Sequence, residues 1–392
     1  MIKGEIILKP KKEQSLLRFH PWVFSGAIYH MEGCEDGELT CVKTAKGEIL
    51  GFGYFTPGAS IAVRMTHFGP QEPTADWILG RLQQAYNLRL QLDLANNEST
   101  DIYRLVHGEG DLLPGLIIDH YAGTLVIQAH TLGMHKIRQQ IAAALQEIYG
   151  ERCQAVYDKS AETLKGVHGI ENAYLVGGGN HQKVAKENGI SFHIDWEGGQ
   201  KTGFFIDQRE NRQLLGQYSA GKKVLNTFSY TGGFSLYALQ AGAELVHSLD
   251  SSARALEMAH ENAKLNGFED RHGIVQADAV QYLKNLEEDY DIIVLDPPAF
   301  AKHLSARHQA VQGYKRINAQ AIRQIKPGGL LFTFSCSQAV DKQLFTATVI
   351  AAAIESGRGV RVLHQLHQPA DHPVNAYHPE GEYLKGLVLR ID

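Results

Sequence analysis

The run Val224-Leu225-Asn226-Thr227-Phe228-Ser229-Tyr230-Thr231-Gly232-Gly233 joins an apolar strand to a glycine turn, and a helix is expected to follow over residues 234–241. The same order of strand, turn and helix repeats downstream. Such alternation predicts an α/β fold in which a parallel sheet has helices on both faces. Further strands are expected over 244–250, 273–277, 292–296, 330–334 and near 360 and 386, with helices over 253–265, 314–325 and 341–356.

Open parallel sheets bind ligands beyond the carboxyl ends of their strands. Asp250 ends the second strand, where its carboxylate can accept hydrogen bonds from two ribose hydroxyls. The turn at 228–233 lacks the three spaced glycines that a pyrophosphate needs, which favours S-adenosylmethionine over a dinucleotide. Asp278 and Ala279 follow the third strand and are expected at the adenine edge. Alternatively, Asp250 only caps the next helix.

Two strand ends carry candidate catalytic side chains. Asp296 precedes Pro297-Pro298-Ala299-Phe300, where two prolines fix an extended backbone. We expect the Asp296 carboxylate to hydrogen-bond a nucleobase and Phe300 to stack on it. Cys336 follows the fifth strand, and a thiolate that adds to carbon 6 of cytosine makes carbon 5 nucleophilic. The alternatives are a structural turn at Asp296 and a small core cysteine at 336.

Charge along the chain is uneven, although the net charge is only −5. No acidic residue occurs from Pro297 to Val340. A basic stretch of this kind attracts phosphates, so RNA contacts are expected there, with a solvated helix face as the alternative. The basic residues of the stretch are Lys302, Arg307, Lys315, Arg316, Arg323 and Lys326.

Residues 1–70 consist of short apolar runs separated by glycine turns, which is typical of a small β-barrel. A cationic segment precedes the aromatic run His20-Pro21-Trp22-Val23-Phe24, and the combination favours RNA backbone contacts with base stacking by Trp22. Core aromatics beside a basic turn are the alternative. The cations are Lys9, Lys11, Lys12 and Arg18.

Residues 71–185 predict a central α+β segment, with a helix over 75–94 and a strand over 116–119. The acidic residues of the turn at 104–115 are expected to be solvated, with a catalytic role as the alternative. The four cysteines have neither zinc-ligand nor disulfide spacing, and no His-Glu-x-x-His pattern occurs, so no metal is expected. Without a signal peptide or a long apolar run, the expected location is cytoplasmic.

Several motifs together resemble the 5-methylcytosine ribosomal RNA methyltransferases of the large-subunit methyltransferase I family. The similarity extends over essentially the whole chain. The aromatic run at 20–24 resembles that family's N-terminal PUA domain, which binds RNA. The other matching segments are Gln200–Arg209, Phe228–Phe234, Asp296–Pro298, Phe334–Ser337, Ala370–Pro373 and Tyr383–Gly386.

The resemblance implies a Rossmann-like, seven-stranded class I methyltransferase domain over 186–392, behind a PUA-like domain (1–70) and a central domain (71–185). It implies that Cys336 is the nucleophile, that Asp296 is the acid that contacts the base, and that the fourth strand lies between the first and fifth. Large-subunit (23S) ribosomal RNA is the implied partner. The implied S-adenosylmethionine site comprises Gln208, Phe228, Ser229, Thr231, Gly232, Gly233, Asp250, Asp278, Ala279 and Asp296.

One departure from the family pattern is Ala299, which replaces a lysine common in part of the family. No motif identifies the base that removes the carbon 5 proton. Two other functions stay open. An RNA N-methyltransferase would use Asp296 and Phe300 and leave Cys336 as packing, and a PUA-bearing RNA-binding or assembly factor would have no activity. The oligomeric state, including a homodimer, is not determined by the sequence.

Overall fold

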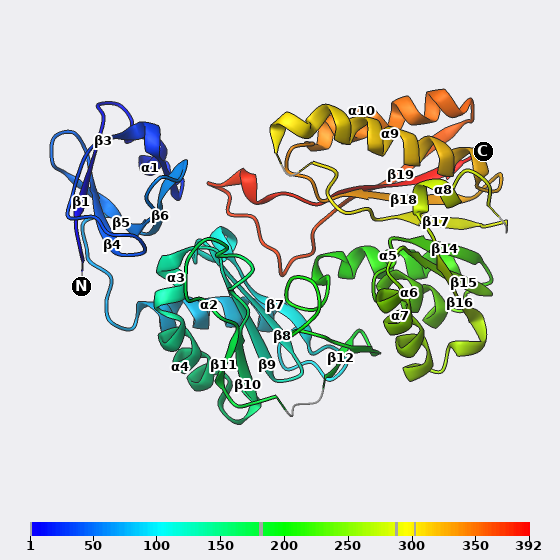
Figure 1. The fold of residues 1–392 in the computed structure, drawn as a ribbon, viewed down its shortest axis with the longest axis horizontal. Helices are drawn as coiled ribbons and strands as arrows, with labels where there is room; N and C mark the ends of the chain where they lie inside the picture. Colours follow the sequence, from blue (N-terminus) through cyan, green and yellow to red (C-terminus); the bar gives the residue numbers. More distant parts are fainter. Residues whose placement is uncertain (1, 180–182, 287–288, 302) are drawn as a thin grey trace. The chain divides into compact units, whose positions relative to one another are not determined.

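The computed structural model describes residues 2–179, 183–286, 289–301 and 303–392. The chain forms two compact units, between which it passes several times (Figure 1). The first unit comprises Met1–Lys186, Ile194–Phe204 and Ala370–Gly381, and the second comprises Glu187–His193, Phe205–Pro369 and Glu382–Asp392. Within the described residues, no helix has both the length and the apolar character needed to cross a bilayer.

The N-terminal part of the first unit is a six-stranded sheet in the order β2-β6-β5-β4-β1-β3, in agreement with the expected small β fold. Ile6, Val42 and Val63 are fully buried in its core. Gly53 lets β5 and β6 approach closely, because a Cβ there would lie 2.4 Å from the Arg64 carbonyl oxygen. The elements are β1 (Glu5–Leu8), α1 (Gln14–Leu17), β2 (Trp22–Phe24), β3 (Ile28–Glu32), β4 (Leu39–Lys43), β5 (Ile49–Phe55) and β6 (Ile61–Phe68).

The central part of the first unit is a five-stranded sheet in the order β11-β10-β9-β8-β7, with an apolar core shared with helices. β9 and β10 are parallel, and the other neighbours are antiparallel. A two-stranded sheet of β12 (Val184–Glu187) and β13 (Ile190–His193) follows. The central elements are α2 (Trp77–Gln91), β7 (Ile102–His107), β8 (Leu116–Tyr121), β9 (Thr124–Ala129), α3 (Leu132–Lys136), α4 (Arg138–Tyr149), β10 (Ala155–Asp158) and β11 (Ala173–Val176).

The carboxylates after β7 are not all solvated, and the expectation for this turn was wrong. The Asp111 side chain is 3% exposed and pairs with the fully buried guanidinium of Arg89. The Nη2 of Arg89 lies 2.8 Å from Asp111 Oδ2 and 2.7 Å from the Asp371 carbonyl oxygen. Asp371 Oδ2 also accepts a 2.9 Å hydrogen bond from the Arg104 amide. The C-terminal segment that contains Asp371 is therefore tied into the core of the first unit.

The second unit is built on a seven-stranded sheet in the order β16-β15-β14-β17-β18-β20-β19. The fourth strand, β17, lies between the first, β14, and the fifth, β18, as the resemblance implied. The sheet is not wholly parallel, however, because β20 pairs antiparallel with both β18 and β19. Its strands are β14 (Lys223–Thr227), β15 (Leu245–Asp250), β16 (His272–Gln276), β17 (Ile292–Leu295), β18 (Leu330–Ser335), β19 (Val360–His367) and β20 (Lys385–Ile391).

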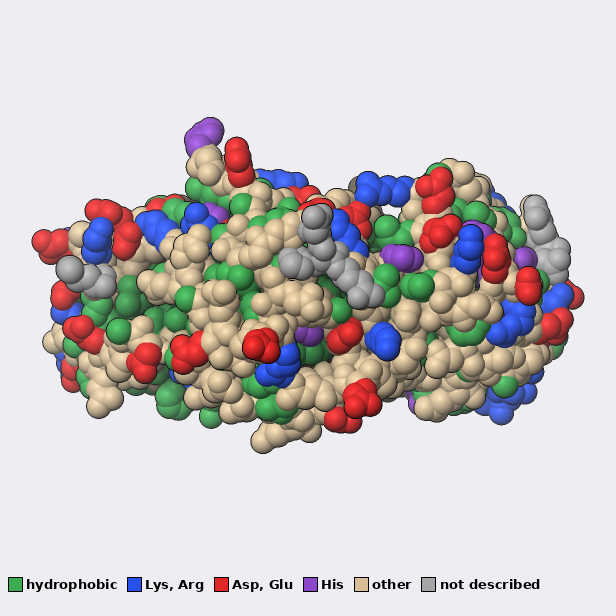
Figure 2. Space-filling model, turned by 90° about the horizontal axis from the view of Figure 1, so that it is seen from below, with side chains coloured by type: hydrophobic (Ala, Val, Ile, Leu, Met, Phe, Trp, Pro, Cys, Tyr) green, Lys and Arg blue, Asp and Glu red, His purple; other side chains and the backbone are tan. Residues whose placement is uncertain are grey.

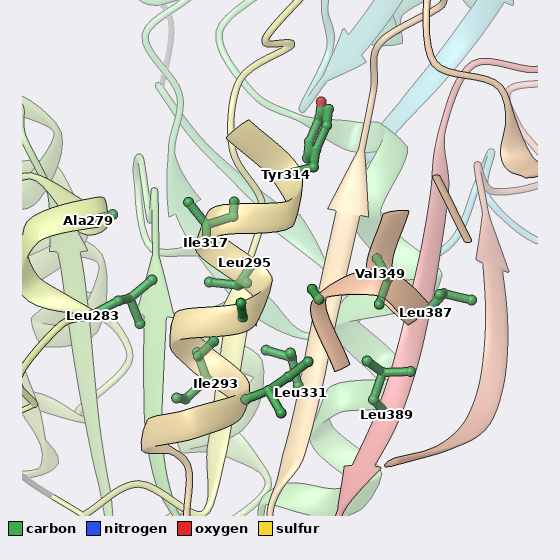
Figure 3. Close-up of a cluster of buried hydrophobic side chains, with 14 of the residues drawn as sticks. Ala279, Leu283, Ile293, Leu295, Tyr314, Ile317, Leu331, Val349, Leu387 and Leu389 are labelled. Atoms are coloured by element: carbon green, nitrogen blue, oxygen red, sulfur yellow. The ribbon is translucent and has the colours of Figure 1, made fainter. Parts of the chain in front are cut away.

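Helices cover both faces of this sheet (Figure 1). The second unit contains α5 (Arg209–Ser219), α6 (Gly233–Gln240), α7 (Ala253–Leu265), α8 (Ala279–Tyr282), α9 (Arg307–Gln324) and α10 (Lys342–Ser356). Figure 3 shows side chains of α8, α9 and α10 packed against Leu295, Leu331 and Leu387 of the strands. In this view Tyr314 lies at the end toward which β18 runs, with its hydroxyl directed away from the aliphatic cluster.

Helix α9 begins seven residues before the expected position of 314. The early turns contain Gly313. In the structure this glycine makes room for the Phe300 ring, since a Cβ at 313 would lie 3.0 Å from Phe300 Cδ2. The glycine is thus explained by packing, and Arg307 and His308 belong to the helix rather than to a loop.

Candidate active site

The loop after β14 has an unusual backbone. Phe228, Tyr230 and Gly232 all have positive φ angles, of 54°, 47° and 82°. Two non-glycine residues in this region indicate strain that the surrounding structure must hold. A Cβ at Gly232 would lie 3.1 Å from Ala259 Cβ, so the glycine allows α7 to approach the loop. The segment 228–233 therefore forms a tight turn between β14 and α6.

The same loop offers an unsatisfied polar group. Ser229 is 6% exposed, and its Oγ has no hydrogen-bond partner among the described residues. Its amide donates a 3.0 Å bond to the Leu249 carbonyl, which fixes the loop against the end of β15. Because buried hydroxyls are normally hydrogen-bonded, a ligand that brings a polar atom to this loop fits the site.

Asp250 is oriented by two backbone amides. Its Oδ2 accepts a 3.0 Å hydrogen bond from Tyr230, and its Oδ1 accepts a 2.9 Å bond from Ser252. The cap of α7 is Ser252, whose hydroxyl accepts from the Ala255 amide, so the alternative function of Asp250 as the cap of this helix does not apply. Each carboxylate oxygen has more than one acceptor site, which leaves capacity for two ribose hydroxyls.

Asp278 follows β16 and lies next to Asp250 along the sheet edge, because the Ala277 amide donates to the Asp250 carbonyl. Its exposed side chain caps α8 by accepting a 2.9 Å hydrogen bond from the Gln281 amide. Ala279 is buried. Gln208 is also buried, at 3% exposure, and its Oε1 accepts a bond from Asn211 Nδ2. Their roles toward a cofactor remain predictions.

Asp296 and Cys336 come from neighbouring parallel strands. Leu295 of β17 pairs with Thr333 of β18, so both chain segments leave the sheet at the same edge. Both side chains are half-buried, and both act electrostatically on Tyr314. Burial raises the pKa of Tyr314 to about 12, and the Cys336 and Asp296 charges add to the rise. The structure thus brings the strand ends that carry the predicted acid and nucleophile to one edge of the sheet.

The segments that carry these two residues are joined by further contacts. Ser335 Oγ donates a 2.9 Å hydrogen bond to the Tyr314 hydroxyl, and Ser337 Oγ donates a 2.7 Å bond to the Ala301 carbonyl. The Phe300 ring packs on Tyr314, with 4.7 Å between ring centroids. One partner of Phe300 is therefore a core tyrosine, and stacking of this ring on a nucleobase stays a prediction.

Lys385, the first residue of β20, was not predicted from the sequence to belong to this site. Its Nζ donates hydrogen bonds to the carbonyls of Ser337, at 2.6 Å, and Tyr383, at 2.8 Å. Burial lowers the pKa of Lys385 to about 8, and the Cys336 charge opposes this shift. The residue lies 49 positions after Cys336 in the chain, so only the insertion of β20 beside β18 brings them together. The matching motif at 383–386 was the one available signal.

The predicted RNA-contacting residues of the first unit differ in exposure. Lys9, Lys11, Lys12 and Arg18 are exposed. Trp22 is half-buried, and its Nε1 donates a 2.7 Å hydrogen bond to Glu109 Oε1, so its polar edge has a protein partner. The more exposed aromatic residues of this part are Phe19, Phe24 and Tyr29, at 50%, 46% and 74%.

The basic residues of α9 divide into two groups. Lys315 and Arg323 both form ion pairs with Glu355 of α10, with N···O distances of 2.9 Å in each. Arg316 is exposed, and the exposed Arg307 donates a hydrogen bond from Nε to the Ala339 carbonyl. Lys302 lies outside the described residues. Figure 2 shows acidic and basic side chains interspersed on the face that it displays.

One cluster of potential metal ligands occurs in the described residues, formed by His20, His378 and Glu380 of the first unit. The His20 Nε2 lies 3.5 Å from Glu380 Oε1. The Trp22 amide, however, donates a hydrogen bond to His20 Nδ1. Nδ1 of His20 therefore already serves as a hydrogen-bond acceptor within the protein.

Comparison with known proteins identifies the class. The family model of S-adenosylmethionine-dependent methyltransferases matches residues 103–379, and the model of PUA-like domains matches residues 6–68. A Streptococcus mutans protein described as a SAM-dependent methyltransferase has the same fold, with a TM-score of 0.84 at 23% identity over the full length of both chains. A methyltransferase crystallised with SAH gives 0.84 at 24%, also over both full chains. The protein is an S-adenosylmethionine-dependent methyltransferase with an N-terminal PUA-like domain.

The relatives narrow this class. Ribosomal RNA large subunit methyltransferase I of Enterobacter sp. (strain 638) is 40% identical over 98% of this chain and 99% of its own. The protein of the same name from Shewanella denitrificans is 39% identical, again over 98% and 99%. The chain belongs to the ribosomal RNA large subunit methyltransferase I family. The predicted family, fold class and cofactor are confirmed, whereas the three-domain boundaries stay a prediction.

Proposed function

We propose that this enzyme methylates carbon 5 of a cytosine in large-subunit (23S) ribosomal RNA, through a covalent bond between Cys336 and carbon 6. The observation that carries the proposal is the position of Asp296 and Cys336 just beyond the ends of the neighbouring parallel strands β17 and β18, at the sheet edge where the 228–233 loop and Asp250 also lie. The names of the relatives support the choice of RNA. The expected setting is the cytoplasm.

The residues act in the following order. The Cys336 thiolate forms a bond to carbon 6, and the electron pair of the carbon 5–carbon 6 double bond moves into the ring. Asp296 accepts a hydrogen bond from the exocyclic amine and holds the ring in place. S-adenosylmethionine, when bound, supplies the electrophilic methyl group that carbon 5 attacks. A base then removes the carbon 5 proton, the sulfur–carbon bond breaks, and its electron pair returns to Cys336.

The strand-end geometry supports the proposed cofactor-binding roles. Asp250 accepts hydrogen bonds from the ribose hydroxyls, and the Ser229 hydroxyl gains the partner that it lacks in the protein. Asp278 and the Ala279 amide face the adenine edge. In the first unit, the exposed cations Lys9, Lys11, Lys12 and Arg18 contact RNA phosphates.

Nucleoside mass spectrometry tests the reaction. Large-subunit RNA is incubated with the enzyme and isotope-labelled S-adenosylmethionine, then digested to nucleosides. The account predicts labelled 5-methylcytidine with the wild type and at least about a thousand-fold less with Cys336→Ala. Cys153→Ala, another half-buried cysteine, is the matched control and should retain activity.

Each alternative function predicts a different result. Label on an exocyclic or ring nitrogen, with full activity of Cys336→Ala, would favour an RNA N-methyltransferase that uses Asp296 and Phe300. No binding of S-adenosylmethionine in calorimetry would leave an RNA-binding or assembly factor.

A further inference from the structure

Lys385 lies beside the nucleophile because of strand pairing. In the antiparallel ladder of β18 and β20, Ser335 pairs directly with Lys385. Directly paired residues project from the same face of a sheet, so the lysine side chain lies on the same face as that of Ser335, the residue before Cys336. Its Nζ reaches the Ser337 carbonyl, one residue beyond Cys336, at 2.6 Å.

The surroundings of this lysine are unusual for a charged group. Lys385 is only 6% exposed, and its Nζ donates hydrogen bonds to two backbone carbonyls. No carboxylate of the described residues lies within 4.0 Å of its Nζ. A buried ammonium without a counter-ion is costly, so the site favours an anion nearby.

Three acidic side chains act electrostatically on Lys385, namely Cys336, Asp341 and Glu382, and the effect of Cys336 is the largest of the three. Burial lowers the pKa of the lysine to about 8. Lys385 is therefore mostly protonated at pH 7, and its charge is lost as the pH rises through about 8. Lys385 is therefore charged at pH values below about 8, where an ordinary thiol, with a pKa of about 8.5, is still protonated.

We propose that Lys385 is a positioning residue that holds Cys336 as a thiolate and serves as its counter-ion. This inference rests on the proposed function in one respect, which is that the Cys336 thiolate is the nucleophile. The thiol proton passes to water before RNA binds, and Lys385 keeps its three protons. When the sulfur–carbon bond forms, the negative charge moves into the pyrimidine ring, and when that bond breaks the electron pair returns to sulfur beside Lys385.

Two variants distinguish a structural role of Lys385 from its proposed role as a counter-ion. A lysine that only holds the 336–338 turn needs hydrogen-bond donors to two carbonyls but no charge. Lys385→Gln keeps donors without the charge, whereas Lys385→Arg keeps both. The two variants therefore separate the electrostatic function from the structural one.

The test is the rate at which iodoacetamide alkylates Cys336 between pH 5 and 10, followed by peptide mass spectrometry without RNA or cofactor. The midpoint of the wild-type rate profile is expected below the ordinary thiol value of about 8.5. In Lys385→Gln it should rise by at least about one pH unit, with an approximately ten-fold lower rate at pH 7. Lys385→Arg should resemble the wild type. Lys342→Gln, at the exposed start of α10, is the matched control.

Several outcomes would overturn the inference. A wild-type midpoint at or above the ordinary thiol value contradicts it without any variant, so it stays falsifiable even if Lys385→Gln fails to fold. An unchanged profile in folded Lys385→Gln contradicts it as well. Because alkylation needs no substrate, a shifted profile combined with full methyl transfer by Cys336→Ala would refute the proposed function alone.

Discussion

Asp250 has its orientation fixed before any ligand binds, because the Tyr230 and Ser252 amides hold one carboxylate oxygen each. A hydrogen bond to a charged group contributes about 1.5–3 kcal/mol. We therefore expect Asp250→Asn to weaken the binding of S-adenosylmethionine by roughly 10- to 100-fold in calorimetry. The control is Glu244→Gln, an exposed carboxylate just before the other end of β15. An unchanged dissociation constant for Asp250→Asn would show that this residue only orders the loop.

Among single residues, the sequence predicted those candidate site residues that follow the end of a strand. Asp250, Asp296 and Cys336 each follow an apolar run, and parallel strands bring such positions to one edge of a sheet. Lys385 begins a strand instead, and its relation to Cys336 depends on β20 being inserted next to β18. Pairing of this kind is a long-range property that local spacing does not encode.

At the scale of elements, helix α9 presents cations in different electrostatic settings. Arg316 is exposed, whereas Lys315 is already paired with Glu355. A phosphate contact by Arg316 contributes to the salt dependence of RNA binding. We expect Arg316→Gln to weaken binding and to reduce the slope of log affinity against log salt by about one. Lys315→Gln is the matched control, with a smaller effect. If both variants lost the same RNA affinity in filter-binding titrations, the Lys315–Glu355 ion pair would have to open when RNA binds.

Most elements of the second unit were predicted, although α5 was not expected. Helix α9 begins earlier than predicted, and Gly313 in its early turns accommodates the Phe300 ring. A strand near 386 was predicted, but its antiparallel direction was not. No α-helix lies between β19 and β20. The intervening segment instead contributes residues 370–381 to the first unit. Periodicity identifies a strand but not its direction.

At the scale of the whole molecule, the chain leaves the first unit at Phe204 and rejoins it at Ala370. Arg89, which is paired with Asp111, donates a hydrogen bond to the Asp371 carbonyl of this returning segment. Removing one partner of a buried ion pair typically costs about 3–5 kcal/mol. We expect Arg89→Met to lower the free energy of unfolding by that amount in urea titrations. Faster hydrogen exchange in residues 370–381 should accompany it. Arg81→Met on the same helix, whose guanidinium bonds to Gln84, is the control and should show neither effect.

The whole account depends on a covalent bond between Cys336 and the target base, and trapping that bond tests it most directly. RNA that carries 5-fluorocytidine at the methylated position cannot lose a proton from carbon 5, so the adduct should persist after methyl transfer. We predict a denaturant-resistant protein–RNA complex with the wild type, mapped by mass spectrometry to Cys336, and none with Cys336→Ala. A wild-type enzyme that methylates the unmodified RNA but forms no such complex would contradict the mechanism.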